Sequence, residues 1–535
     1  MRRRLCVLVA VALSGSVLLA QSPKGHDVLW QIRREAVEQS QVLATLHMLT
    51  DRYGPRLTGS PNHKAAAEWA AAQLTRWGLS NAHLEPWNFD HEGWLNERLT
   101  AHIVAPVKDA LVAEALAWTP GTPGTVRGPA TLVTLPPRPS RDELTKYLES
   151  VKAQVAAHVV LVGEPHQVGV SFAPPAKRLD DGELRARFDP VAPSAFGPPQ
   201  IGPPPGGPAP NRLTPAQVDQ IVDEFLVANH ALARFNDAGR DHGQIRAFNN
   251  RTFDVAKAVP TLVVRNEDYG RIARLLRDGP VELELDVVNR TYPEGRTSYN
   301  VVAELPGSDL ASEVVMLGGH LDSWHAATGA TDNAIGVSVM MDAIRVLEAV
   351  GARPRRTIRI ALWGGEEQGL LGSAAYVKEH FGSVEEPKPE FAKFAGYLNI
   401  DSGTGRARGA TVFGPALASA IVRQIFEPLE DLGVVGASST SSRRRGGSDH
   451  TSFNEAGLPG IGFAQDPIEY QSDTWHTNLD TFERIIPEDA MKSTAIIAWT
   501  AYQLASRGEM LPRFSKDEMP KAPQPPPTSS GGGGH

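Results

Sequence analysis

The sequence predicts an α/β protein in which a mostly parallel central sheet, flanked by helices, is interrupted by a β-rich insertion. After Asn300, short apolar segments alternate with longer segments of helical periodicity, which is typical of a parallel sheet covered by helices. Between about residues 99 and 296 the pattern changes to short β-branched segments separated by turns. The chain has 535 residues, which is too long for one ordinary domain.

The first 20 residues predict a secretory signal. Arginines at positions 2–4 precede an apolar run over residues 5–19, and polar residues follow. This run is shorter than the roughly 20 residues that span a bilayer. We expect residues 1–20 to be removed and the protein to be secreted or periplasmic, without stable membrane insertion. The only cysteine, Cys6, lies in this signal, so the mature protein would have no disulfide and no thiolate ligand.

The charge of the chain argues against a nucleic acid partner. The formal net charge is -8, and acidic and basic residues are interspersed. A surface that binds a polyanion would instead gather basic residues on one face.

Before the insertion, the sequence predicts helices followed by one strand. Ser60 can cap a helix that has Pro61 in its first turn. This helix is expected over residues 65–77, because Gly78 ends it, and residues 83–87 then have an extended pattern.

Within the insertion, strands are expected at residues 130–134, 158–162 and 260–264. A Pro-rich and helical part is expected at about residues 166–255. In it, residues 190–210 are dense in proline and glycine and predict a surface loop, and the apolar spacing over residues 214–236 predicts one amphipathic helix.

After the insertion, strands are expected at residues 314–317, 357–362 and 395–400, with helices at 334–350 and 372–381. The tail over residues 515–535 is rich in proline and ends in glycines and one histidine. Such a composition cannot form a core, so we expect the tail to be disordered.

Charged side chains follow each of these three strands. In chain order they are His320 with Asp322 and Asp332, then Glu366 with Glu367, and then Asp401, and a further histidine, His476, lies in a polar loop. Open α/β sheets place ligand sites at the C-terminal ends of their strands. Histidine and carboxylate ligands suit a divalent ion such as zinc, which takes about four ligands including water. The pattern therefore predicts a metal site.

The number of candidate ligands suits two ions roughly 3.5 to 4 Å apart that hold one water between them. One set would be His320, Asp332 and Asp401, and the other Asp332, Glu367 and His476, with Asp332 shared. Glu366 is then free to take a proton from the water. Asp322 is expected to hydrogen-bond the second ring nitrogen of His320.

Together these motifs resemble peptidase family M28, whose members are di-zinc exopeptidases. The resemblance rests on residues 319–324, Asp332 with Asn333, residues 363–369, Asp401, and His476 with Thr477. Residues 353–357 and 509–513 resemble the carboxypeptidase Q-like (plasma glutamate carboxypeptidase) branch. The resemblance implies a zinc exopeptidase-like catalytic domain over residues 27–98 and 297–513, with a protease-associated-like domain over residues 99–296.

The resemblance also implies roles for the site residues. Two Zn²⁺ ions per chain would be bound by His320, Asp332, Glu367, Asp401 and His476. Glu366 would be the general base, and Asp322 would support the site without touching a metal. A homodimer is also expected from the resemblance.

The expected activity is hydrolysis of dipeptides or short peptides from a free N-terminus, by water that the two zinc ions activate and from which Glu366 removes a proton. The alternative among peptidases is a carboxypeptidase. An alternative of another class is a non-catalytic, receptor-like binding protein on the same fold, and a glutaminyl cyclase of this type is a third.

Two features of the expected site stay open. Tyr470 and His450 are both candidates for the group that donates to the oxyanion. Residues 438–448 form a basic loop, which is either solvated or brings residues 443–445 to the mouth of the site. In the second case an arginine would bind the free carboxylate of a peptide.

Overall fold

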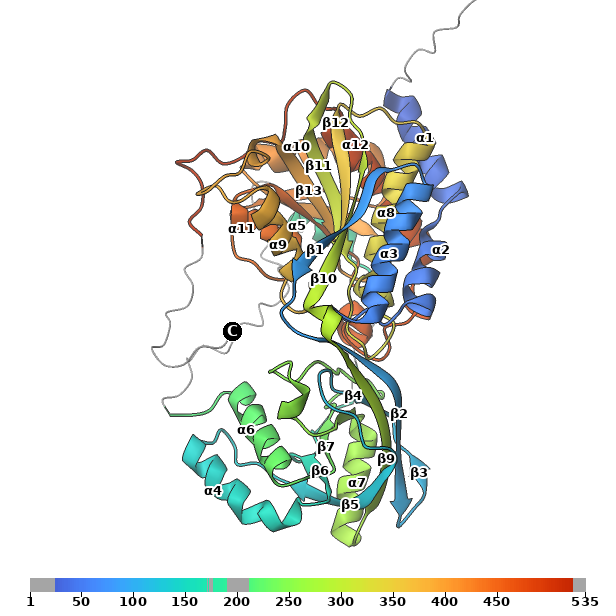
Figure 1. The fold of residues 1–535 in the computed structure, drawn as a ribbon. Helices are drawn as coiled ribbons and strands as arrows, with labels where there is room; N and C mark the ends of the chain where they lie inside the picture. The colour runs from blue at the N-terminus through green and yellow to red at the C-terminus, as the bar shows by residue number, and fades with distance from the viewer. Residues whose placement is uncertain (1–24, 171, 173–176, 190–210, 523–535) are drawn as a thin grey trace, which may run out of the picture.

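The structure is a computed structural model that describes residues 25–170, 172, 177–189 and 211–522 (Figure 1). The predicted signal at residues 1–20, the Pro-rich loop at residues 190–210 and the end of the tail from residue 523 lie outside the described residues. Among the described helices, none is both long and apolar enough to cross a membrane.

The described chain forms two eight-stranded sheets, which we call sheet A and sheet B (Figure 1). The strands of sheet A, in spatial order, are β1 (Ser80–Asn88), β10 (Thr297–Leu305), β12 (Arg356–Trp363), β11 (Leu310–His320), β13 (Phe394–Ile400), β16 (Gly460–Gln465), β14 (Ala407–Phe413) and β15 (Ala437–Thr440). The neighbours β12, β11, β13 and β16 run parallel, whereas β1 with β10, β10 with β12 and β14 with β16 pair antiparallel. Sheet A is therefore mixed but mostly parallel, as the sequence predicts.

Helices cover both faces of sheet A. One face carries α1 (Gly25–Glu38), α2 (Val42–His47), α3 (Pro61–Arg76), α8 (Ile335–Ala349), α10 (Ala416–Phe426) and α12 (Pro487–Ser506). The other face carries α9 (Leu371–His380) and α11 (His450–Ala456). Ser60 caps α3 as predicted, because its side chain accepts from the backbone N–H of His63. The apolar residues of these helices bury the two faces of the sheet.

Sheet B lies at one end of sheet A and contains β3 (Asp109–Ala110), β2 (Gly93–Ala105), β9 (Glu282–Tyr292), β5 (Val126–Val133), β6 (Val159–Val162), β7 (Ala233–Asp237), β8 (Thr261–Val264) and β4 (Ala113–Ala115), in this spatial order. Its helices are α4 (Arg141–Val151), α6 (Pro215–Ala228) and α7 (Asn266–Asp278). The three strands expected at residues 130–134, 158–162 and 260–264 correspond to β5, β6 and β8. Helices α4 and α7 were not predicted from the sequence.

The single helix expected over residues 214–236 is wrong. Helix α6 ends at Ala228, and β7 begins at Ala233 as a buried strand between β6 and β8. His230 has a φ of 54°, a left-handed conformation that cannot continue a right-handed helix. The apolar residues of the strand follow the helix so closely that they extend its periodic pattern.

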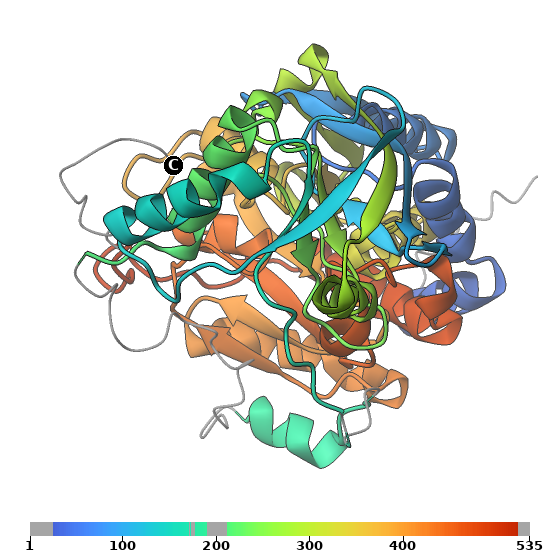
Figure 2. The ribbon, with the colours of Figure 1, turned by 90° about the horizontal axis from the view of Figure 1, so that it is seen from below.

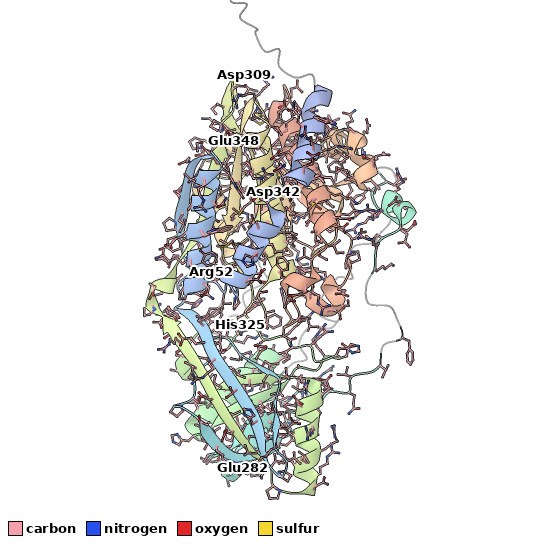
Figure 3. The ribbon with its side chains drawn as sticks, turned by 90° about the vertical axis from the view of Figure 1, so that its right-hand side faces the viewer. Arg52, Glu282, Asp309, His325, Asp342 and Glu348 are labelled. Atoms are coloured by element: carbon pink, nitrogen blue, oxygen red, sulfur yellow. The ribbon has the colours of Figure 1, made fainter. Side chains whose placement is uncertain are left out.

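One part of the predicted insertion packs on sheet A. Helix α5 (Asp181–Arg187) lies apart from the other helices of this region (Figure 2). Arg408 of β14 forms ion pairs with Asp181 and with the buried Asp466. The two sheets also meet near His325 (Figure 3), whose Nε2 is 2.6 Å from the carbonyl oxygen of Ala115 in β4.

Candidate metal centre

The candidate ligands meet at one end of sheet A. His320 is the last residue of β11, Asp401 follows β13 directly, and Glu367 lies in the turn after β12. Because these three strands are adjacent and parallel, their C-terminal ends lie side by side. Asp332 lies in the short segment Ala330–Ala334 just before α8, and its own backbone is not helical, with φ −132° and ψ 89°. This is the edge of the sheet at which the sequence places them.

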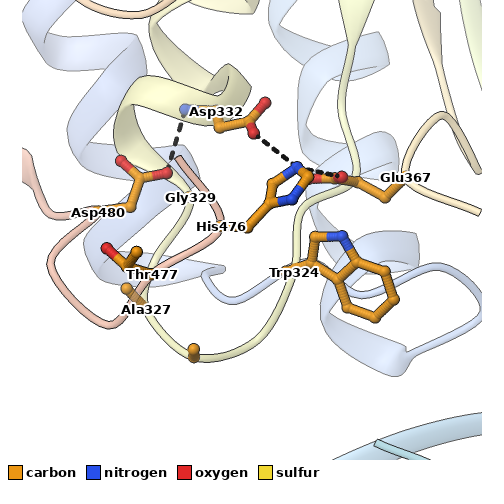
Figure 4. A pocket seen from close by; sticks show the side chains of 9 residues that line it. Trp324, Ala327, Gly329, Asp332, Glu367, His476, Thr477 and Asp480 are labelled. Carbon is orange, nitrogen blue, oxygen red and sulfur yellow. Dashed lines mark hydrogen bonds and ion pairs between the residues drawn. The ribbon is translucent and has the colours of Figure 1, made fainter. Parts of the chain in front are cut away.

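The two histidines face opposite oxygens of one aspartate. Nε2 of His320 is 3.2 Å from Oδ1 of Asp332 and 3.3 Å from Oδ1 of Asp401. Nε2 of His476 is 3.1 Å from Oδ2 of Asp332 and 2.9 Å from Oε2 of Glu367 (Figure 4). Ligand atoms of His320, Asp332 and Glu367 all lie within 4.8 Å of one another. The cluster thus has two halves that share Asp332.

The cluster carries buried negative charge that favours a bound cation. The side chains of Asp332, Glu367 and Asp401 are only 5%, 3% and 6% exposed. Oε1 of Glu367 has no hydrogen-bond partner among the described residues. Unpaired buried carboxylates are costly, and a divalent ion would offset that cost. Imidazole nitrogens and carboxylate oxygens are zinc ligands, so the donor set fits zinc.

The pKa values in the cluster agree with this view. Burial alone would lower the pKa of His320, but the charges of Asp401 and Glu366 raise it well above its usual range. At His476 burial is likewise outweighed, because Glu367 and Asp332 raise the pKa to about 10. Both histidines thus attract protons, and a divalent ion bound by the same nitrogens would displace them.

Glu366 differs from its neighbour Glu367. It lines a cavity of about 570 Å³ that adjoins the cluster, but it forms no ion pair with His320 or His476. Burial raises the pKa of Glu366 well above its usual range, against the attraction of His320. A carboxylate in this position can accept a proton and pass it on.

The carboxylate of Asp322 holds the backbone of the two glutamates, and its carbonyl oxygen contacts the ring of His320. Its carbonyl oxygen lies 3.0 Å from Nδ1 of His320, so Asp322 does contact the second ring nitrogen as expected, but through its backbone, because its carboxylate is 3.7 Å away. The carboxylate instead accepts from the backbone N–H groups of Glu366 and Glu367, both at 3.2 Å, and from Oγ1 of Thr58 at 3.0 Å. These three donors satisfy a buried carboxylate better than one imidazole would.

Two further residues, Asp480 and Arg56, support the site, and the sequence predicted no role for them. The carboxylate of Asp480 accepts from the backbone N–H of Thr331 at 2.5 Å. It also accepts from the backbone N–H of Asp332 at 3.1 Å (Figure 4). The buried Arg56 donates to the carbonyl oxygens of Leu321 and Gly329 at 2.7 and 3.0 Å. Together they fix the loop between His320 and Asp332. Their partners lie 148 and 265 residues away in sequence, so no local pattern identifies them.

The two oxyanion candidates differ in position. Tyr470 lines the 570 Å³ cavity together with Glu366 and Asp401. The ring of His450 packs against Gly462 of β16, and burial lowers its pKa to about 4. His450 is not among the residues that line the cavity, so the geometry favours Tyr470.

The three arginines of the basic loop, residues 443–445, lie in different surroundings. Arg443 is buried and donates to the carboxylate of Glu385 at 2.7 and 3.0 Å, so it cannot bind a substrate. Arg445 lines the cavity, and its only ion pair with a described residue is a long one of 3.8 Å to Glu455. Arg444 is exposed and does not line the cavity.

Comparison with known proteins gives a consistent result. Residues 300–501 match the model of peptidase family M28. Carboxypeptidase Q from Mus musculus is 27% identical over 477 residues, which cover 89% of this chain and 88% of the mouse protein. The crystal structure of a peptidase M28 precursor from Shewanella amazonensis SB2B is 25% identical, with a TM-score of 0.62, and the match covers 92% of this chain and 99% of that one.

A zinc aminopeptidase from Bacillus subtilis has the same fold, with a TM-score of 0.54 at 19% identity over 89% of this chain and 98% of that one. The segment matched by the family model contains all six of the side chains that form the cluster and its cavity edge, namely His320, Asp332, Glu366, Glu367, Asp401 and His476. Residues 300–501 therefore form a peptidase family M28 segment, and the chain is an M28-type metallopeptidase.

Proposed function

We propose that this protein is an exopeptidase that uses two zinc ions to hydrolyse dipeptides or short peptides. The proposal is carried by Asp332, whose two carboxylate oxygens face different histidines at 3.2 and 3.1 Å. A carboxylate shared between two ligand sets is what a pair of metal ions requires. His320, Asp332 and Asp401 would hold one zinc, and Asp332, Glu367 and His476 the other.

The residues around the cluster have separate tasks in this proposal. Bound zinc would supply a Lewis acid that polarises the peptide carbonyl and makes water more acidic. Glu366 accepts the proton of the attacking water on its carboxylate and then donates it to the leaving amine. Asp322 fixes Glu366 through its backbone N–H.

Tyr470 is the proposed donor to the oxygen that gains charge. Its hydroxyl stays protonated, because burial raises the pKa of Tyr470 well above its usual range. A protonated phenol in the cavity can donate a hydrogen bond that strengthens as negative charge develops.

Arg445 supports the choice of dipeptides and short peptides as substrates. Among the described residues that line the cavity it is the only arginine, and the other charged groups there are carboxylates and His476. A guanidinium group binds a carboxylate through two parallel hydrogen bonds. A dipeptide bound with its scissile bond at the cluster would present its free carboxylate to this side of the cavity.

The proposed activity is tested by assaying a free dipeptide beside its N-acetylated and C-amidated forms. We expect cleavage of the free dipeptide, loss of cleavage on acetylation, and inhibition by a chelator that added zinc reverses. Cleavage of the acetylated but not of the amidated peptide would identify a carboxypeptidase. A protein that binds no zinc and cleaves none of these peptides would contradict the proposal and favour a receptor-like role.

The role of Arg445 is tested with Arg445→Gln and, as a matched control, Arg444→Gln. We expect Arg445→Gln to raise KM for the free dipeptide. The slower cleavage of the C-amidated dipeptide should not change, because that peptide has no free carboxylate for Arg445 to bind. Arg444→Gln should change neither. An equal effect of both variants would contradict this role.

We also propose that residues 1–20 direct export and that residues 99–296 form a protease-associated-like domain. The basic and apolar order of the first residues supports export to the cell exterior or the periplasm. Sheet B, whose strands fall between Gly93 and Tyr292, supports the domain boundary. Mass measurement of the exported protein would test the first proposal.

A further inference from the structure

The loop over residues 470–478, which carries the second histidine of the cluster, is held by a segment that connects two strands of sheet B. This segment, residues 240–248, lies between β7 and β8, and we call it the clamp segment. Arg246 donates from Nε to the carbonyl oxygen of Trp475 at 3.1 Å. Its guanidinium also lies 4.6 Å from the ring centre of Trp475, within the range of a cation–π contact.

Further hydrogen bonds join the same two segments on either side of Trp475. Arg240 donates to the carbonyl oxygen of Ser472 at 3.0 Å. Asn478 exchanges two bonds with Ile245, at 2.8 Å through its side chain and 3.0 Å through its backbone N–H. Its side-chain amide donates to the carbonyl oxygen of Gly243 at 3.2 Å. The loop is thus fixed at both ends and in the middle.

The ring of His476 depends on this packing for its orientation. Its Nδ1 is buried and has no hydrogen-bond partner among the described residues. A metal-binding imidazole is normally oriented by a hydrogen bond at its second nitrogen. Here the ring lies against Phe248 of the clamp segment, with 5.5 Å between the ring centres, and against Trp475, with 4.1 Å. The backbone of His476 also has a φ of 61°, which a side chain tolerates only when its surroundings impose it.

We infer that the clamp segment positions His476, so that a part of the chain outside sheet A sets the affinity of the second metal site. This inference rests on the proposed function, because it concerns an ion held at His476. Arg246 and Phe248 touch no ligand oxygen of the cluster in the contacts described here, so they act as positioning residues through Trp475 and His476.

The inference is tested with Arg246→Met, with Arg246→Lys as the conservative variant and Arg265→Met as the matched control. Arg265 donates to Asp268 of α7 at 2.7 Å, so its loss removes a similar contact within the sheet B region. Two quantities are measured: hydrogen exchange over residues 472–478 without metal, and zinc affinity by competition with a chelator. Asn478→Ala serves if Arg246→Met does not fold.

In Arg246→Met we expect faster exchange over residues 472–478 and about tenfold weaker binding of one of two zinc ions. Arg246→Lys, which keeps a donor for Trp475, should recover part of both, and Arg265→Met should match the wild type. Unchanged exchange in both Arg246→Met and Asn478→Ala would overturn the inference. Absence of zinc binding by the wild type would instead overturn the proposed function, and the exchange data would still decide the role of the clamp segment.

Discussion

The two histidines of the metal centre are held in different ways. His320 ends a buried strand of sheet A, its side chain is 1% exposed, and its Nδ1 lies 3.0 Å from the carbonyl oxygen of Asp322. His476 lies in a loop, is 13% exposed and has no hydrogen bond at Nδ1 from the described residues. His320 is therefore held within sheet A itself, whereas His476 also depends on contacts from the clamp segment. We expect the two halves to respond differently to change.

The largest difference is expected between His320→Ala and His476→Ala. Each should lose one zinc and essentially all activity. Both histidines pair with buried carboxylates, but the side chain of His320 is 1% exposed and that of His476 is 13% exposed, so His320→Ala removes the more deeply buried partner. Breaking a buried pair typically costs about 3 to 5 kcal/mol, so the free energy of unfolding should fall in both variants and should fall more in His320→Ala. Zinc analysis and thermal unfolding measure both effects, with the exposed His83→Ala as control. Equal destabilisation by the two variants would show that the two histidines contribute alike to the stability of the fold.

Glu366→Gln provides a reference that alters neither half. Because Glu366 makes no ion pair with either histidine, both zinc ions should stay bound. Activity should fall by about 10² to 10⁴-fold, the usual loss when a general base is removed. Zinc content and kcat are measured on the same preparation. Loss of zinc together with activity would make Glu366 a ligand instead.

Asp480→Asn tests the support of Asp332, the residue that the two halves of the site share. The amide can accept only through its oxygen, so one of the backbone N–H groups of Thr331 and Asp332 loses its charged acceptor. Outer partners of metal ligands typically contribute about 10 to 100-fold in affinity, and we expect a loss near the lower end for both ions. The exposed Glu483→Gln is the control. A loss confined to one ion would show that Asp332 is not shared.

The smallest effect concerns pH. In the metal-free protein the pKa of His476 is raised to about 10, so its imidazole is protonated at neutral pH, and zinc must displace that proton. Zinc affinity should therefore fall as pH falls, by about tenfold per pH unit for each displaced proton. Titrations in buffers of different pH measure this slope. An affinity that does not vary between about pH 6 and pH 8 would contradict the raised pKa.

The sequence predicts the His320 half of the site better than the His476 half. His320, Glu367 and Asp401 follow buried strands, and the topology of a parallel sheet brings such positions together without further information. Asp480, Arg56 and the clamp segment act across 148 to 265 residues through loops whose course no periodic pattern encodes. For the same reason the sequence did not predict the contacts of the Asp322 carboxylate. Its hydrogen bond with the backbone of Glu366 depends on the conformation of the turn after β12.

The sequence predicts the elements of sheet A better than those of sheet B. Strands and helices of sheet A follow from alternating apolar segments, and Ser60 caps α3 as expected. In sheet B the short strand β7 merges with the pattern of α6. Helices α4 and α7 were not predicted, because each buries only a few apolar residues, Leu144 and Leu148 in α4 and Tyr269, Ile272 and Ala273 in α7. Periodicity identifies long buried elements well and short mixed ones poorly.

The register of β1 with β10 has a consequence for how such a molecule could arise. The chain leaves sheet A after Asn88 and returns at Thr297, and these two residues are direct partners across the strand pair. A short hairpin turn can join such partners, so the whole of sheet B can be gained or lost at one point without breaking a strand of sheet A. An ancestor without this region would need another support for its second histidine. Relatives that lack sheet B are therefore the place to look for a hydrogen bond at that imidazole's free nitrogen.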